Sequence, residues 1–218
     1  MNKRSIIKKT ISFAKDKLSK DCTGGHDWWH IERVWNNAKA INKKEGADQF
    51  IIDLAVLLHD VGDWKVIGAK EDDYTIAENF LVKNKVKEDV IEKVMFIIKN
   101  MSFSSTFDKK TKETSKEFKV VQDADRLDAL GAVGIARMFA YGGSRQRSIY
   151  DPSEKIQKIK SKTAYKEINS STFRHFYDKV LFLKDLMNTK TARAIAGKRH
   201  KYVESYIKQF LSEWGGEK

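Results

Sequence analysis

Side chains that bind metals and move protons stand together at position 59, where a histidine is followed by an aspartate. The pair His59-Asp60 closes the most apolar stretch of the chain, LLHDVGD (57–63). An imidazole and a carboxylate at the edge of a core are costly to desolvate unless they pair or coordinate an ion. Taken alone, the doublet fits better a histidine that caps a helix end, with Asp60 as its hydrogen-bond partner.

A second polar group lies in HDWWHIERV (26–34). On a helix, His30, Arg33 and Asn37 fall at positions i, i+3 and i+7 and share one face. Ile31 and Trp35 occupy the opposite side. The spacing therefore predicts a helix that presents His30 and two further polar side chains in one direction.

The same segment holds a second doublet, His26-Asp27, so the metal-binding pair has to be assigned. His26-Asp27 follows a Gly-Gly turn and has the character of a helix start, with Asp27 as the N-cap. We assign the metal-binding doublet to His59-Asp60 because that pair follows a buried helix. His26 remains open between a contact to the site and an exposed loop histidine.

Three aspartates stand close together in QDADRLDALG (122–131). Asp125 and Asp128 are three residues apart and share a helical face, whereas Asp123 points elsewhere. A surface acidic stripe would account for them, but the apolar residues around them indicate a largely buried helix.

The strongest combination is His30, His59, Asp60 and Asp125. Two neutral imidazoles and two carboxylates suit an octahedral first-row divalent ion that keeps positions for water and substrate. We take Mn²⁺ as the first choice, with Fe²⁺, Co²⁺, Ni²⁺ and Mg²⁺ as alternatives. Cys22 is not needed, which argues against a sulfur-rich structural zinc site.

A histidine, a His-Asp doublet and a distant aspartate, each on its own helix, resemble the HD-domain superfamily of metal-dependent phosphohydrolases. The stretches HDWWHIERV, LLHDVGDWK and QDADRLDALGAVGIAR are similar to those of small bacterial HD-domain proteins that are nucleoside triphosphate pyrophosphohydrolases. The similarity extends through FYDKVLFLKDLMNTKTARAIAGKRHKYV and so spans most of the chain.

The resemblance implies that these four residues are the metal ligands. It implies that Asp63 or Asp60 accepts or steers the proton of the attacking water. It places Asp128 behind the ligands, in a supporting position. Substrate contacts are expected from Lys65, Arg33, His26, Arg126 and Lys179. For Asp63 and Lys65, helix termination and surface charge remain the alternatives.

Helical spacing of apolar residues recurs along the chain, and a single proline removes the commonest helix breaker. We expect an all-α fold: one HD-type domain over residues 1–218, with a metal-site core at about 20–140 and C-terminal helices, about 150–214, packed on that core. The predicted helices are 6–18, 31–41 (ending at Gly46), 48–59, 74–82, 86–98, 116–130, 132–141, 172–187 and 191–214. Residues 102–115 are expected to form a mobile loop.

Composition sets limits on partners. Lysine and arginine number 42 against 30 acidic residues, a net charge of +12, but the lysines are spread along the chain as on solvated helix faces. A single cysteine and the lack of a signal peptide or membrane-spanning run predict a cytoplasmic protein without a membrane partner. We expect a small nucleotide as the substrate, do not expect nucleic acid, and leave a homodimer open.

Within the same chemistry, a nucleoside 5′-monophosphatase or a phosphodiesterase is the alternative to the pyrophosphohydrolase. From another class, a non-catalytic HD module that binds a nucleotide or nucleic acid is the alternative. The complete ligand set favours an enzyme over such a module.

Overall fold

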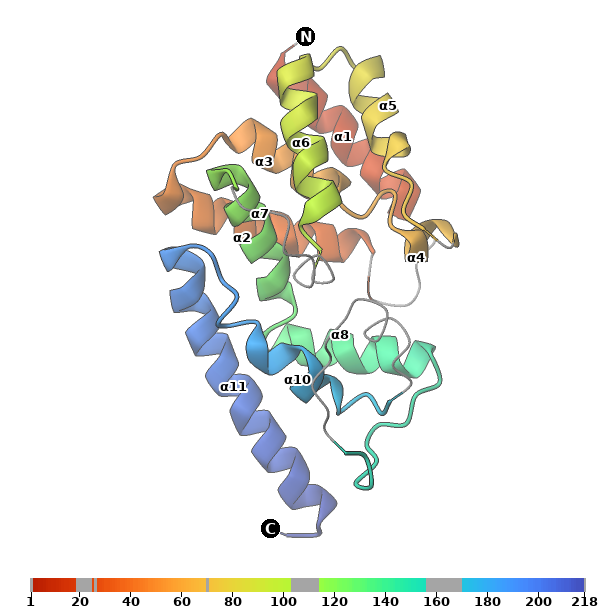
Figure 1. Cartoon of the computed structure of the whole chain (residues 1–218), viewed down its shortest axis with the longest axis vertical. Coiled ribbons are helices and arrows are strands. Elements are labelled where there is room, and N and C mark those ends of the chain that lie inside the picture. The colour runs from red at the N-terminus through yellow and green to blue at the C-terminus, as the bar shows by residue number, and fades with distance from the viewer. Residues whose placement is uncertain are drawn as a thin grey trace. The chain divides into compact units, whose positions relative to one another are not determined.

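Helices account for all the regular secondary structure that the computed structural model describes (Figure 1). It describes residues 2–18, 25, 27–69, 71–102, 114–155 and 170–217, with the side chain of Lys65 left out. The all-α prediction is therefore confirmed, and the predicted loop at 102–115 lies largely outside the described residues. In the same ranges, no helix is both long enough and apolar enough to cross a membrane. The chain forms two compact units, Met1–Ala124 and Asp125–Lys218, and the single-domain organisation stays a prediction.

The first unit is built around α3, which contacts α1, α2 and α6. Every residue of α3 except Gln49 and Asp53 is buried, as the apolar run in the sequence predicts. A helix that is apolar on all sides has to be surrounded by others. The helices of this unit are α1 (Lys3–Leu18), α2 (Trp28–Glu45), α3 (Gln49–Leu58), α4 (Trp64–Ile67), α5 (Thr75–Lys83), α6 (Glu88–Asn100) and the larger part of α7 (Lys116–Asp128).

Local capping fixes where α2 and α3 begin and where α2 ends. Asp27 caps α2, because its side chain accepts a hydrogen bond from the His30 amide. The helix ends at Gly46, which adopts the left-handed conformation with φ 67° that glycine tolerates best. Asp48 then caps α3 through the amide of Phe50. The predicted cap at Asp27 and the predicted end at Gly46 are both confirmed.

Polar side chains fasten α2 to α3 beside the apolar contact. The indole N–H of Trp35 donates to Asp53 at 2.7 Å, and the Gln49 amide donates to the same oxygen at 2.7 Å. Asn42 in turn donates to Gln49 at 2.8 Å. This network accounts for the aspartate in the most apolar helix, and it holds in register the two helices that carry the histidines of interest.

The second unit contains α8 (Gly131–Ser144), α10 (His175–Asp178), the 3₁₀ helix η2 (Val180–Phe182) and α11 (Lys190–Trp214). The predicted helix 191–214 is confirmed. The predicted continuous helix 172–187 is wrong, because single turns replace it and the backbone breaks at Lys179 with φ −143° and ψ −55°. The buried apolar residues of this stretch still recur every three or four positions: Phe173, Phe176, Val180, Leu183 and Met187. A chain of short helical turns produces the same spacing as one long helix.

Candidate metal centre

His30, His59 and Asp60 bring three potential ligand atoms together in the first unit. The Nε2 atoms of the two histidines are 3.3 Å apart. The Asp60 carboxylate approaches His30 Nε2 at 3.5 Å and His59 Nε2 at 3.4 Å, through a different oxygen in each case. All three residues are buried, and their ligand atoms lie within 4.8 Å of one another.

These separations fit one divalent ion. First-row divalent metals bind nitrogen and oxygen at about 2.1 Å, so two ligands of one ion lie roughly 3.0 to 3.4 Å apart when their bonds meet at about 90 to 109°. The observed separations of 3.3, 3.4 and 3.5 Å are at or just above this range. The three side chains therefore fit a first-row divalent metal such as Mn²⁺.

Each histidine is oriented by its own helix. His59 is the C-cap of α3, and its Nδ1 lies 2.8 Å from the carbonyl oxygen of Val56. With Nδ1 as the donor in that bond, the lone pair belongs to Nε2, the atom that faces His30 and Asp60. His30 lies in the first turn of α2, and its backbone amide is held by Asp27 at 2.8 Å.

The predicted fourth ligand, Asp125, lies on α7 in the second unit, and its part in the site stays a prediction. The preceding residue, Ala124, belongs to the first unit, and its carbonyl accepts a hydrogen bond from Asn37 on α2 at 3.2 Å. Asn37 shares the helical face of His30, so that face of α2 is bonded to α7 at Ala124 within the first unit. Asp123, which had no assigned role, is fully buried in the first unit.

Arg33 and Asp63, both in the first unit, are half-buried. Arg33 lies on α2. Asp63 follows the doublet, with its amide donating to the Asp60 carbonyl at 3.1 Å. The carbonyl of Asp63 accepts from Val66 and starts α4, a one-turn helix that lies outside the predicted helices. Lys65 belongs to α4, and neither its side chain nor His26 lies within the described part of the chain.

Three further predicted residues, Arg126, Asp128 and Lys179, lie in the second unit. Arg126 donates to the carbonyl of Leu186. Asp128 is buried and forms an ion pair with Arg137 at 2.8 Å, and its supporting position behind the ligands stays a prediction. Lys179 is half-buried at the break after α10. Their predicted roles toward a substrate stay predictions.

Two residues that the sequence did not single out, Asp72 and Tyr74, lie close to the loop after Asp60. The Tyr74 hydroxyl donates to Asp72 at 2.9 Å, and the other oxygen of Asp72 accepts from the Trp64 amide at 3.0 Å. Burial raises the pKa of Tyr74 well above its ordinary value, and the carboxylate of Asp72 raises it further. The negative charges of Asp63 and Asp60 raise the pKa of Tyr74 further.

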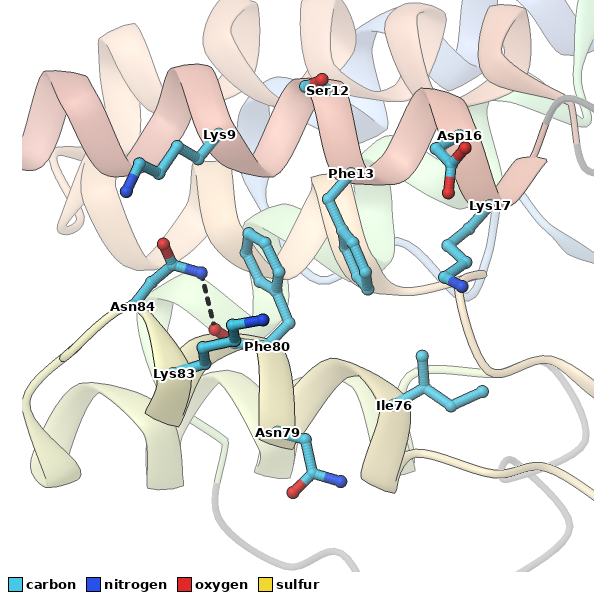
Figure 2. Close-up of a pocket in the computed structure, with 10 residues that line it drawn as sticks. All are labelled: Lys9, Ser12, Phe13, Asp16, Lys17, Ile76, Asn79, Phe80, Lys83 and Asn84. Carbon is cyan, nitrogen blue, oxygen red and sulfur yellow. Dashed lines mark hydrogen bonds between the residues drawn. The ribbon is translucent and has the colours of Figure 1, made fainter.

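A cleft of about 750 Å³ opens elsewhere in the first unit, between α1 and α5 (Figure 2). The rings of Phe13 and Phe80 stack across it with centroids 4.1 Å apart. Lys9 and Lys17 project from α1 toward α5 at its two ends. The described residues that line it include none of the predicted site residues, so the cleft and the candidate metal centre are separate features.

Comparison with known protein families identifies an HD domain in this chain. The family described as HD domain matches residues 28–130, a range that includes all four predicted ligands. The chain is 38% identical over 196 residues to the uncharacterized protein YpgQ of Bacillus subtilis, covering 90% of this chain and 88% of YpgQ. The chain belongs to the HD-domain family.

Solved structures of HD-domain relatives agree over nearly the whole chain. A Lactobacillus plantarum protein superposes with a TM-score of 0.86 at 34% identity, covering all of both chains. An HD-superfamily hydrolase from Bacillus thuringiensis gives 0.75 at 42% identity, over 99% of this chain and all of the other. YpgQ, solved in complex with ADP, gives 0.77 at 35% identity, over 98% and 96% of the two chains. This protein therefore has the fold of an HD-superfamily hydrolase, with a His-His-Asp group suited to a divalent ion.

Proposed function

We propose that this HD-domain protein is a metal-dependent phosphohydrolase that acts on nucleotides. In the form we favour, it converts a nucleoside triphosphate to the monophosphate and pyrophosphate. The observation that carries the proposal is the convergence of His30, His59 and Asp60 within 3.5 Å in a chain of this family. The ADP complex of YpgQ supports a nucleotide as the ligand.

The fourth ligand in this proposal is Asp125. The HD-domain match supports it, because residues 28–130 include Asp125 together with the other three predicted ligands. A second carboxylate would also bring the ligand set nearer to electrical balance with a divalent cation.

An ion held by these residues would polarise a phosphoryl oxygen and lower the pKa of water, which supplies a nucleophile near neutral pH. Asp63 accepts or steers the proton of the attacking water, because it lies three residues after Asp60 in the chain and is half-buried. Lys65 and Arg33 offset the charge that spreads over the phosphoryl oxygens.

Hydrolysis in water labelled with ¹⁸O tests both the activity and the phosphorus attacked. Protein stripped of metal and reloaded with Mn²⁺ is incubated with a nucleoside triphosphate. The products are then separated, and their masses are measured by mass spectrometry. The proposal predicts label in the monophosphate and unlabelled pyrophosphate, with no product before reloading. Labelled inorganic phosphate together with a nucleoside diphosphate would instead mean attack at the terminal phosphorus.

The same assay separates the alternatives. Phosphate released from a nucleoside monophosphate indicates a nucleotidase, and opening of a cyclic nucleotide indicates a phosphodiesterase. A non-catalytic module gives no product with any nucleotide. Binding to nucleic acid that falls steeply with salt and survives loss of His59 would indicate a protein that uses its positive charge instead.

A further inference from the structure

The loop that follows Asp60 is fastened by a second segment, Asp72–Tyr74. The Asp73 amide donates to the carbonyl of Gly62 at 2.8 Å, and the Trp64 amide donates to the Asp72 carboxylate at 3.0 Å. These two bonds hold the backbone on either side of Asp63. The position of Asp63 therefore depends on a segment about ten residues further along the chain.

Asp72 bridges the two segments with both of its oxygens. One oxygen accepts from Trp64 at the start of α4, and the other accepts from the Tyr74 hydroxyl at 2.9 Å. Tyr74 is half-buried and keeps its proton at neutral pH, because burial and the charge of Asp72 both raise its pKa. A tyrosine in that state can only donate to the carboxylate, which keeps Asp72 turned toward α4.

Gly62 shows how closely the two segments are packed. A Cβ atom at this position would lie 2.1 Å from the carbonyl oxygen of Asp73 and 3.2 Å from the Tyr74 amide nitrogen. Both are backbone atoms, so no side-chain movement would relieve the contact. The glycine in HDVGD is thus required by the close approach of Asp72–Tyr74, and the backbone of Gly62 is not in the left-handed region.

We propose that Asp72 and Tyr74 are positioning residues for hydrolysis: through the Trp64 amide they fix the loop that carries Asp63 beside the metal centre. The kinetic part of this inference rests on the proposed function. Neither side chain is assigned a contact with the substrate or the metal. Their effect is on the geometry of the residue that takes the proton from water, where small displacements lower the rate strongly.

Tyr74→Phe removes only the hydroxyl, and Asp72→Ala removes the whole bridge. We expect kcat to fall about tenfold for Tyr74→Phe, and further for Asp72→Ala, with KM and the Kd for Mn²⁺ within about threefold of the wild type. Because the two residues act as one unit, the double variant should be no slower than Asp72→Ala alone. The matched control is Thr75→Val, which removes the hydroxyl bond from Thr75 to Asp73 at 2.5 Å without touching α4.

Hydrogen exchange of the Trp64 amide supplies a readout that does not depend on activity. Asp72→Ala should abolish the protection of this amide, Tyr74→Phe should reduce it, and Thr75→Val should leave it unchanged. Unaltered kcat in an active Tyr74→Phe and Asp72→Ala, or an equal loss in Thr75→Val, would overturn the inference. If the wild type has no hydrolytic activity, the proposed function is wrong. Unchanged exchange of the Trp64 amide in both Tyr74→Phe and Asp72→Ala would then also refute the positioning role of these two residues.

Discussion

Removing the carboxylate of Asp27 tests whether the start of α2 holds His30 ready for a metal. The Asp27 side chain accepts from the amide of His30 itself at 2.8 Å. His30 is the third residue of the helix, and in Asp27→Ala this first turn loses its cap. The variant leaves the imidazole in place, so any change in metal affinity arises from the positioning of His30.

The expected size follows from the loss of one cap. Replacing an N-cap aspartate by alanine costs about 1 kcal/mol. In a domain of this length that lowers Tm by roughly 2 to 4 °C. If the first turn frays without the metal, binding has to restore it, so the same 1 kcal/mol appears as about a fivefold weaker Kd for Mn²⁺.

Asp48→Ala is the matched control. Asp48 caps α3 through the Phe50 amide at 2.8 Å, at the opposite end of that helix from His59. Thermal unfolding without metal and calorimetric titration with Mn²⁺ are measured for both variants. Both should lose similar stability, but only Asp27→Ala should bind Mn²⁺ more weakly. Equal Mn²⁺ affinity in the two variants would refute the coupling between the cap and the metal site.

Two further predictions concern stability. Mn²⁺ at a hundred times its Kd should stabilise the fold by about 2.7 kcal/mol, which corresponds to roughly 5 to 11 °C in Tm by differential scanning fluorimetry; an equal rise in His59→Ala would place the metal elsewhere. Burial raises the pKa of Asp178, and among the described residues its Oδ2 has no hydrogen-bond partner. Its charged form therefore destabilises the fold once the pH exceeds the unfolded pKa of about 3.9. Asp178→Asn should raise Tm at pH 7 and not below about pH 3.5; a lower Tm at pH 7 would mean that the ion pair with Arg174 outweighs burial.

Local signals were sufficient for the elements that carry the two histidines. An aspartate before an apolar periodic run and a glycine after it set the bounds of α2, and both are properties of a few adjacent residues. The apolar run of α3 indicated a central helix with a polar doublet at its end. The convergence of His30 with His59 required the resemblance to a family, because 29 residues separate them in the chain.

The spacing of apolar residues gave a wrong prediction where more than one kind of structure produces the same spacing. Between 172 and 187 the buried apolar residues recur at helical spacing, yet the chain forms separate turns that bury Phe173 and Phe176 in an aromatic cluster with Phe210. The positions of Asp72 and Tyr74 were missed for another reason. Their positions depend on a backbone contact between Gly62 and Asp73. The glycine in HDVGD was the one feature of the sequence that could have indicated this contact.

Counting the Mn²⁺ ions bound per chain, in parallel with hydrolysis of a nucleoside triphosphate, tests the central claim most directly. The wild type should bind one ion by electron paramagnetic resonance titration and form product only when that ion is bound. His59→Ala and Asp125→Ala should lose both together while remaining folded by circular dichroism. Full activity in either folded variant would contradict the site, and so would tight Mn²⁺ binding retained in His59→Ala.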